Sequence, residues 1–346
     1  MSRKVVIVGP DTGGIPQSIA KAFERLGWQA ETCLYLPPVI TSVGKLLLHR
    51  LRDPHSDRAF RREFNRVIRE GLLQVVAERG ADLILILKGD YLDECHAGLL
   101  QSCRIPIVLW TLDSLSRAPA QRILAQMALH TFYIDGGDLA PGAAAASWLP
   151  LGFDADLYRP QPASAKDIDV LLIGSLGARY RRRGAALKRL HASPLSRDWS
   201  CGFIGSSGTI AGNLAMTLRH RSRRPGGVSW LSRRVPAGQL AGAIARSRIC
   251  VNIHQDDGLM PVNPMFFAIP GCGTCQLAEE SPHLARWLRP GVDYAACSEA
   301  SLLAELQRLL ESPELLETIG CAGYLASSRH SYEARVAAIL AQIGGA

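Results

Sequence analysis

Residues 240–280 read LAGAIARSRICVNIHQDDGLMPVNPMFFAIPGCGTCQLAEE, and they decide the fold. Apolar residues recur here first at helical spacing and then in short continuous runs that are typical of buried strands. The stretch and its continuation to Leu340 predict, in order, a helix over 240–248, a strand over 249–254, a polar loop over 263–273, a strand over 274–277, a Pro-Gly turn at 290–291 and two amphipathic helices. Strands that alternate with helices in this way indicate a parallel sheet covered by helices.

The same alternation extends toward the N-terminus. Further apolar runs predict strands over 5–8, 82–87, 105–110, 130–134 and 168–174, with helices over 16–26, 68–79 and 332–343. The proline-rich stretch 158–162 is typical of a linker. We therefore expect an N-terminal Rossmann-like domain over 1–155, a C-terminal Rossmann-like domain over 156–330, and a last helix within 331–346 that could pack back on the first domain.

The composition is that of a globular chain. It has 346 residues, of which 47% are hydrophobic, and this is enough for two domains with large cores. No apolar run approaches the roughly 20 residues that span a bilayer. The N-terminal run Val5–Val8 is too short for the core of a signal peptide. We expect a cytoplasmic protein without a transmembrane segment.

The nine cysteines are scattered along the chain. Cys272 and Cys275 form a lone C-x-x-C motif. A zinc site would need a second cysteine pair or a histidine cluster, and the sequence supplies neither. We therefore expect these thiols to be buried as small hydrophobic groups, and we expect no metal.

The net charge is +8, and much of the excess lies between Arg179 and Arg234. This density favours an anionic partner, such as a nucleotide diphosphate, a phosphorylated glycan, a membrane surface or a nucleic acid. A solvated helix face followed by a mobile loop explains the pattern equally well.

One candidate anion site follows the predicted strand 168–174. The turn Gly174-Ser175 leaves that strand, and Arg181 comes a few residues later. At the carboxyl end of a strand, backbone N–H groups and a bidentate guanidinium suit a diphosphate. The alternative is a simple surface turn.

A second group of polar residues lies around the predicted strand 249–254. Departure of a diphosphate without a metal needs cationic or N–H donors, and the rest of the ligand needs polar side chains. The candidates are Asn252, His254, Asn263 and the turn at Gly273. A capped structural histidine, and an asparagine that only fixes the loop, are the alternatives.

Acidic residues follow apolar runs of the first domain. They are, in order of preference, Asp113, Asp90 and Asp11. Such positions face ligands in α/β sheets, and a carboxylate there could act as a general base, although a turn or N-cap role is the alternative. Gly13 and Gly14 let the backbone turn sharply after the first strand but do not form a dinucleotide fingerprint.

Several segments together resemble the CgeB-like (spore-maturation) family of bacterial glycosyltransferases. In the family's order they are 107–114, 148–154, 158–160, 169–175, 252–273 and 330–335. The resemblance implies a GT-B fold, in which two Rossmann-like parallel-sheet domains face each other across a cleft. It also implies a nucleotide-sugar donor on the C-terminal domain and an acceptor facing the N-terminal domain, near Asp11, Gly13 and Gly14.

The chain departs from this family in its central block. The family reads Asn-x-Arg-x-Phe-Glu, and its glutamate is expected to hold ribose or sugar hydroxyls of the donor. The same register begins here at Asn263 and gives Met265 and Ala268 in place of the arginine and the glutamate. Glu279 or Glu280, after the next strand, could retain the ribose contact, and we select Glu280.

Together with this resemblance, the residue patterns predict a metal-independent glycosyltransferase that moves a sugar from a nucleotide-diphosphate sugar, UDP- or dTDP-linked, to a hydroxyl of a glycan, protein or other anionic acceptor. No metal is expected because no D-x-D-like acidic pair follows a strand of the second domain, and no cofactor is expected besides the donor. His254, Asp113 and Asp90 are the candidate catalytic residues. The alternatives are a GT-B-fold binding or scaffold protein that has lost the chemistry, and a transferase that acts on nucleic acid.

Overall fold

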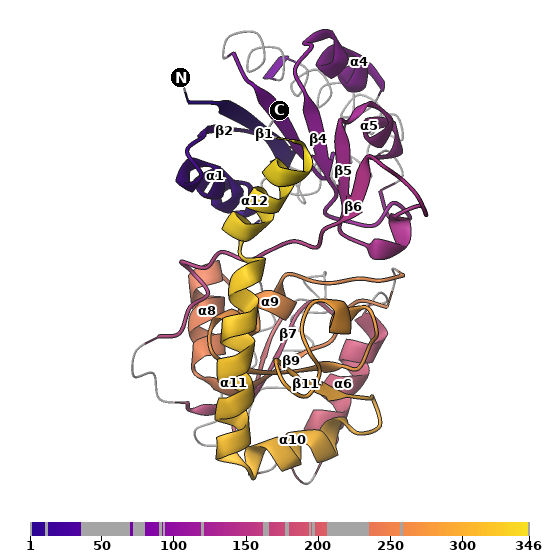
Figure 1. Cartoon of the computed structure of the whole chain (residues 1–346). Helices are drawn as coiled ribbons and strands as arrows, with labels where there is room; N and C mark the ends of the chain where they lie inside the picture. The colour runs from indigo at the N-terminus through magenta and orange to yellow at the C-terminus, as the bar shows by residue number, and fades with distance from the viewer. Residues whose placement is uncertain are drawn as a thin grey trace, which may run out of the picture. The chain divides into compact units, whose positions relative to one another are not determined.

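Contacts within the computed structural model divide the chain into two compact units (Figure 1). Unit 1 contains residues 1–150 and 335–346, and unit 2 contains residues 151–334. The structure describes residues 2–10, 13–35, 70–71, 80–89, 92, 94–118, 121–161, 166–176, 180–193, 195, 198–205, 235–256 and 259–344. Asp11, Asp90 and most of the predicted helix 68–79 lie outside these residues, as do Arg179 and the arginines from 219 to 234.

Unit 1 is built on a six-stranded parallel sheet with the order β2-β1-β3-β4-β5-β6. The strands are β1 (Lys4–Pro10), β2 (Gln29–Tyr35), β3 (Leu83–Leu87), β4 (Ile107–Trp110), β5 (His130–Tyr133) and β6 (Ala146–Trp148). The helices are α1 (Ile15–Arg25), α4 (Glu94–Ser102), α5 (Gln121–Met127), the short η1 (Gly136–Asp138) and most of α12 (Tyr332–Gln342). Every residue of β3 is buried, as expected for a parallel strand that is covered on both faces.

Unit 2 is built on a five-stranded parallel sheet with the order β11-β10-β9-β7-β8. The strands are β7 (Ile168–Ile173), β8 (Cys201–Ile204), β9 (Ser247–Asn252), β10 (Cys275–Glu279) and β11 (Ala295–Cys297). The helices are α6 (Arg181–Ala192), α8 (Ala237–Ala245), α9 (Met265–Gly271), η4 (Leu284–Arg286), α10 (Leu302–Leu310), α11 (Pro313–Ser327) and η5 (Ser328–His330). The long helix α11 packs against α9 and β10 (Figure 1).

The strand order of unit 2 contains a topological switch point. The chain runs from β7 to β8 on one side of β7, and then crosses to β9 on the other side. Loops therefore leave the carboxyl ends of β7 and β9 in opposite directions, and parallel α/β sheets commonly bind ligands at such a point. The topology alone thus selects the residues after Ile173 and after Asn252.

The predicted loop over 263–273 is wrong, because residues 265–271 form the helix α9. Four consecutive residues, 266–269, are fully buried, so packing favours a helix where the prolines suggested a loop. Pro264 starts this helix, and Pro270 lies inside it. Pro270 has no N–H for the carbonyl of Phe266, four residues earlier. The Gln276 side chain donates to that carbonyl instead (3.2 Å) and so replaces the hydrogen bond that the proline cannot make.

The other predicted strands and the helices over 16–26, 240–248 and 332–343 are confirmed within a few residues. The sequence analysis missed β2, β8 and β11, which are short or carry polar residues. No helix in the described part of the chain is both long and apolar enough to cross a membrane.

Candidate functional site

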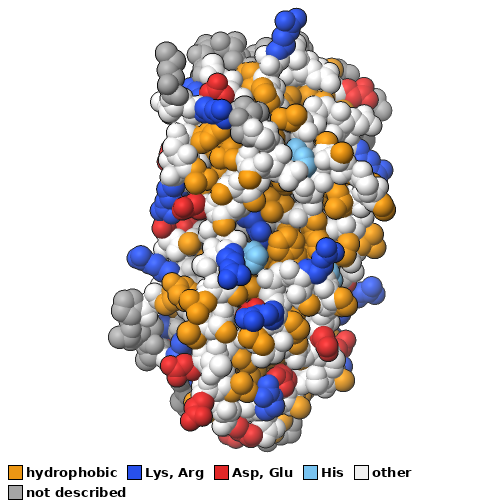
Figure 2. Space-filling model, in the orientation of Figure 1, with side chains coloured by type: hydrophobic (Ala, Val, Ile, Leu, Met, Phe, Trp, Pro, Cys, Tyr) orange, Lys and Arg blue, Asp and Glu red, His pale blue; other side chains and the backbone are white. Residues whose placement is uncertain are grey.

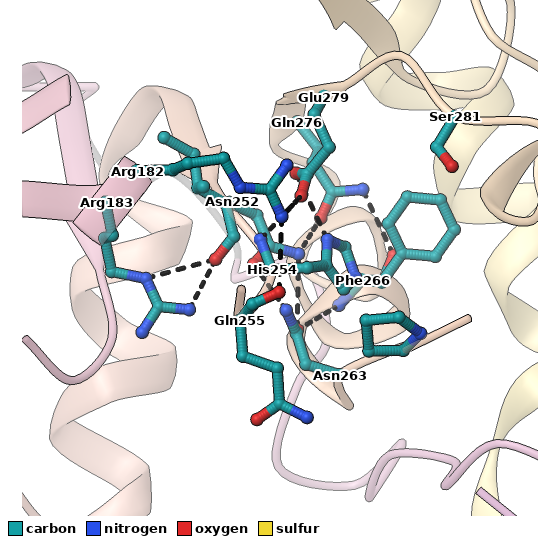
Figure 3. A network of polar contacts seen from close by, with 12 residues as sticks. Arg182, Arg183, Asn252, His254, Gln255, Asn263, Phe266, Gln276, Glu279 and Ser281 are labelled. Carbon is teal, nitrogen blue, oxygen red and sulfur yellow. Dashed lines mark hydrogen bonds and ion pairs between the residues drawn. The ribbon is translucent and has the colours of Figure 1, made fainter. Parts of the chain in front are cut away.

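Polar side chains of unit 2 gather at the carboxyl edge of its sheet (Figure 3). Gly174 and Ser175 follow β7, His254 and Asp256 follow β9, and Glu279 ends β10. The edge therefore combines a glycine turn with histidine, carboxylate and, from the first turn of α6, arginine side chains. All of these groups lie at or beside the switch point between β7 and β9.

His254 is held by Glu279 through two contacts. The backbone N–H of His254 donates to Oε1 of Glu279 (2.8 Å), and the ring Nδ1 lies 3.2 Å from Oε2. The side chain is 2% exposed, and its ring meets Phe266 edge-on, with 5.6 Å between ring centroids. Among the described residues, its Nε2 is buried and has no hydrogen-bond partner. Glu279 thus fixes the orientation of the ring while Nε2 remains available.

Glu279 is ionised at neutral pH. Burial by itself would raise the pKa of this carboxyl group, but the charge of His254 and the hydrogen bonds from its ring and backbone outweigh burial. The pKa of Glu279 is consequently about 2. Glu280, which the sequence favoured for this region, is exposed, and Glu279 joins the cluster instead. Adjacent residues of a strand point to opposite faces, so the acidic pair alone did not show which one turns inward.

Arg182 and Asp256 form the next part of the cluster. The guanidinium Nε of Arg182 donates to Oδ1 of Asp256 (2.9 Å), and its Nη2 lies 3.7 Å from Oε1 of Glu279. The other oxygen of Asp256 accepts the backbone N–H groups of Arg181 (2.6 Å) and Arg182 (3.4 Å). The carboxylate therefore sits at the N-terminus of α6, where the helix dipole favours negative charge. The Arg181 side chain itself is exposed.

Arg183 ties the two loops of the switch point together. Its Nη1 donates to the carbonyl of Ser175 (2.7 Å), and its Nε and Nη2 donate to the carbonyl of Ile253. The side chain is 5% exposed and its guanidinium lies over the Tyr180 ring, 4.7 Å from the centroid. A Cβ at Gly174 would come within 2.5 Å of Nη1 of Arg183, so only glycine fits there.

A chain of side-chain amides joins β9, β10 and α9. Asn263 donates to Asn252 (2.9 Å), and Asn252 donates to Gln276 (3.2 Å). The Asn263 oxygen also accepts the backbone N–H of Phe266 (3.2 Å), which caps the start of α9. Asn252 and Asn263, both proposed from sequence as ligand contacts, thus bond to each other and hold α9 in place.

Gly273 lies away from this cluster. It precedes β10 and lines a cavity of about 470 Å³ together with Lys166 and Arg248. These residues come at the start of their strands, so the cavity belongs to the amino edge of the sheet. The structure therefore brings together Gly174, Ser175, Arg181, Asn252, His254 and Asn263, but not Gly273.

In unit 1, Asp113 follows β4 and is paired with two cations. Its Oδ2 lies 3.2 Å from Nζ of Lys88, and its Oδ1 lies 2.9 Å from Nη1 of Arg117. Gly13 and Gly14, after β1, have φ values of +58° and +81° and lead into α1. Of the residues that the sequence predicted for this domain, the described part of the chain thus shows Gly13 and Gly14 after β1 and Asp113 after β4.

Asp138 is a further carboxylate of unit 1, and the sequence analysis missed it. It ends η1, after β5, and accepts the N–H of Leu115 (2.8 Å). Burial and the nearby Asp135 raise the pKa of Asp138 despite that hydrogen bond. The two glycines that precede it gave no sign in the sequence of a partly buried carboxylate.

The cysteines form no disulfide, and Cys272 and Cys275 are buried as predicted. Burial raises the pKa of both thiols to about 12, so neither is a reactive thiolate near neutral pH. Within the described ranges, no three His, Cys, Asp or Glu side chains are grouped so that they could hold a metal ion.

The fold of the chain is shared by solved structures. HepE (Alr3699) of Anabaena, crystallised in complex with UDP-glucose, has 14% sequence identity and a TM-score of 0.69, over 99% of this chain and 100% of the other. Sucrose-phosphate synthase from Thermosynechococcus elongatus has 12% identity and a TM-score of 0.65, over 97% of each chain. An α,α-trehalose-phosphate synthase (UDP-forming) from Burkholderia vietnamiensis has 13% identity and a TM-score of 0.65, over the whole of both chains. These similarities establish the GT-B fold.

The sequence comparisons assign the family. Comparison with curated proteins found no match. Residues 165–341, just over half of the chain, match the family model described as glycosyl transferase-like. The matched residues include the switch point of unit 2 and all the side chains of the cluster around His254. The chain therefore belongs to the glycosyl transferase-like family and is a glycosyltransferase of the GT-B fold.

Proposed function

We propose that the donor of this glycosyltransferase is a UDP-sugar and that unit 2 binds it at the switch point between β7 and β9. The observation that carries the proposal is the cluster there, in which a glycine turn, the N-terminus of α6, Arg182 and the ring of His254 converge. N–H groups and guanidinium groups at the carboxyl edge of a parallel sheet are suited to a diphosphate. Structures of HepE contain UDP and UDP-glucose, which supports uracil as the base, with dTDP as the close alternative.

Within this proposal, each residue has a defined task. The Gly174 N–H already donates to Ile204 (2.9 Å), so the Ser175 N–H and hydroxyl are the turn's donors for a phosphate. Arg181 and Arg182 neutralise the leaving diphosphate, and His254 contacts the donor through Nε2. Such fixed donors stabilise the charge that develops on a leaving group without a metal ion.

Met265 and Ala268 replace the arginine and the glutamate that the CgeB-like pattern would have, and Ala268 is fully buried. We propose membership of the CgeB-like subfamily from the other matching segments, because these two positions depart from its pattern. If the family's glutamate contacts ribose, a different residue must do so here, and Glu279 and Glu280, at the end of β10, are the candidates.

We also propose that unit 1 supplies the general base for the acceptor hydroxyl. Asp113 is the candidate from sequence, and Asp138 is the second candidate because burial raises its pKa. On the face drawn in Figure 2, Lys and Arg side chains are dispersed among hydrophobic and acidic ones. The cytoplasmic location stays a prediction from the sequence.

A thermal-shift panel tests the proposal. The purified chain is melted with UDP, dTDP, ADP, GDP and the corresponding nucleotide sugars, each with and without EDTA. The proposal predicts a rise in Tm with UDP or dTDP that EDTA leaves unchanged. No rise with any nucleotide at millimolar concentration would favour a scaffold protein that has kept the fold without the chemistry.

A further inference from the structure

We propose that Asp256 is an internal competitor of the donor phosphate, so that a nucleoside diphosphate must displace this carboxylate in order to bind. The proposal rests on the donor site of unit 2 proposed above. It adds a residue that sets the affinity of that site and that is not among the predicted ligand contacts.

The contacts of Asp256 are those that a phosphate group would make. One oxygen accepts the N–H groups of Arg181 and Arg182 at 2.6 and 3.4 Å, and the other accepts Nε of Arg182 at 2.9 Å. The side chain is only 16% exposed. Backbone N–H groups of a helix N-terminus combined with a guanidinium form an anion site, and two anions cannot use the same donors at once.

A second observation at the same cluster indicates a ligand. His254, two residues before Asp256, has a buried Nε2 without a hydrogen-bond partner among the described residues. A buried polar atom without a partner is costly, and a ligand oxygen would remove that cost. Glu279 links the His254 ring to the Arg182–Asp256 ion pair, because it holds the ring and its Oε1 lies 3.7 Å from Nη2 of Arg182.

Asp256 also differs from an ordinary helix cap. The N-cap residue of α6 is Tyr180, which makes no capping hydrogen bond through its side chain. The capping carboxylate comes instead from the loop after β9, 75 residues away along the chain. A purely structural cap would lower stability when it is removed and would leave phosphate affinity unchanged, whereas a competitor would raise phosphate affinity when it is removed.

The experiment is a calorimetric titration of UDP and of pyrophosphate into the full chain and its variants. Asp256→Asn keeps the shape of the side chain and removes its charge, and Asp256→Ala removes the group altogether. We expect both ligands to bind the two variants about fivefold more tightly than the wild type. In the wild type, the ligand must first break the capping interaction of the Asp256 carboxylate, and the free energy of one such cap corresponds to about fivefold in Kd. The matched control is Glu299→Gln, since Glu299 pairs with Arg189 (2.9 Å) near the other end of α6. This control should bind UDP like the wild type.

The outcomes separate the two claims. If the wild type binds UDP and the folded Asp256 variants bind it no more tightly, the competitor role is overturned while the donor site stands. If neither the wild type nor any variant binds UDP or pyrophosphate, the donor site itself is overturned, and the competitor role with it. Should Asp256→Ala fail to fold, the titration of Asp256→Asn still decides.

Discussion

Gly174 combines a φ of +120° with a close approach to the guanidinium of Arg183. Gly174→Ala should lower the free energy of unfolding by about 3 kcal/mol, because the new Cβ is strained in this backbone conformation and displaces Arg183. Gly184→Ala is the matched control, since Gly184 lies within α6 with open space around it. That control should be neutral or stabilising by up to about 1 kcal/mol. Urea unfolding of both variants measures the difference, and equal midpoints would contradict the assigned contact.

Ionisation of Glu279 makes the stability of the fold depend on pH. Its pKa of about 2 lies below its ordinary value of 4.5, so the ionised group stabilises the fold fully above pH 4.5. This contribution, at most about 3 kcal/mol, is lost as the pH falls from 4.5 through 2. Glu279→Gln should therefore be less stable than the wild type at pH 7, and the gap should narrow below pH 4.5.

Tm measured against pH tests this prediction. The exposed neighbour Glu280 provides the control, and Glu280→Gln should follow the wild-type curve. A gap between Glu279→Gln and the wild type that stays constant from pH 7 to pH 2.5 would contradict the ion pair with His254.

At this scale the sequence could predict which segments carry the site but not how each side chain is used. The turn at Gly174 and the position of His254 after a strand followed from the strand pattern. The roles of Asp256 and Glu279 did not, because each depends on a partner about 25 or 75 residues distant along the chain.

At the scale of elements, α9 depends on the amide of Asn263. This side chain caps Phe266 and pairs with Asn252, which is itself buried. Asn263→Ala removes the cap and leaves the Asn252 amide short of a partner, so it should destabilise the protein by about 2 kcal/mol. Ser301→Ala, at the start of α10, is a control whose side chain is exposed and bonded only to Ser298. Urea midpoints that shift equally for both variants would mean that the hydrogen bonds among Asn252, Asn263 and Gln276 do not contribute to the free energy of unfolding.

The misprediction of α9 as a loop has a physical cause. Proline at 264 and 270 is normally a sign of irregular structure. Here Pro264 starts the helix, and the carbonyl that Pro270 leaves without a donor is bonded by Gln276, a residue of the neighbouring strand. Local propensity could not include that tertiary hydrogen bond.

For the molecule as a whole, the parallel sheets followed from the alternation of apolar runs and helical patterns. The strands that were not predicted have weaker runs of apolar residues. β11 has only three residues, and β2 carries polar residues among its seven. Their places in the sheets come from pairing with stronger neighbours, β10 and β1. The match to the GT-B fold confirms the predicted fold class, whereas the order of the strands within each sheet was not predicted from the sequence.

Thiol reactivity reports on the packing of unit 2, which contains the four buried cysteines named below. Cys95 and Cys321 are exposed, whereas Cys250, Cys272, Cys275 and Cys297 are buried. Burial raises the pKa of Cys297 to about 12, as it does for Cys272 and Cys275. A thiol reagent at pH 8 should label the exposed pair first and reach the buried four only after denaturant is added. Peptide mapping by mass spectrometry identifies the sites, and early labelling of Cys272 or Cys275 would contradict the packing of α9 against β10.

The proposed metal-independent use of a UDP-sugar donor is tested most directly by measuring the release of UDP from UDP-sugars by the purified chain in the presence of EDTA. The account predicts slow hydrolysis of at least one UDP-sugar without an added acceptor. It also predicts that Arg182→Ala lowers the rate about tenfold or more, because the leaving diphosphate loses a guanidinium. A folded wild-type protein that releases no UDP from any of these donors, or an Arg182→Ala variant as fast as the wild type, would contradict it.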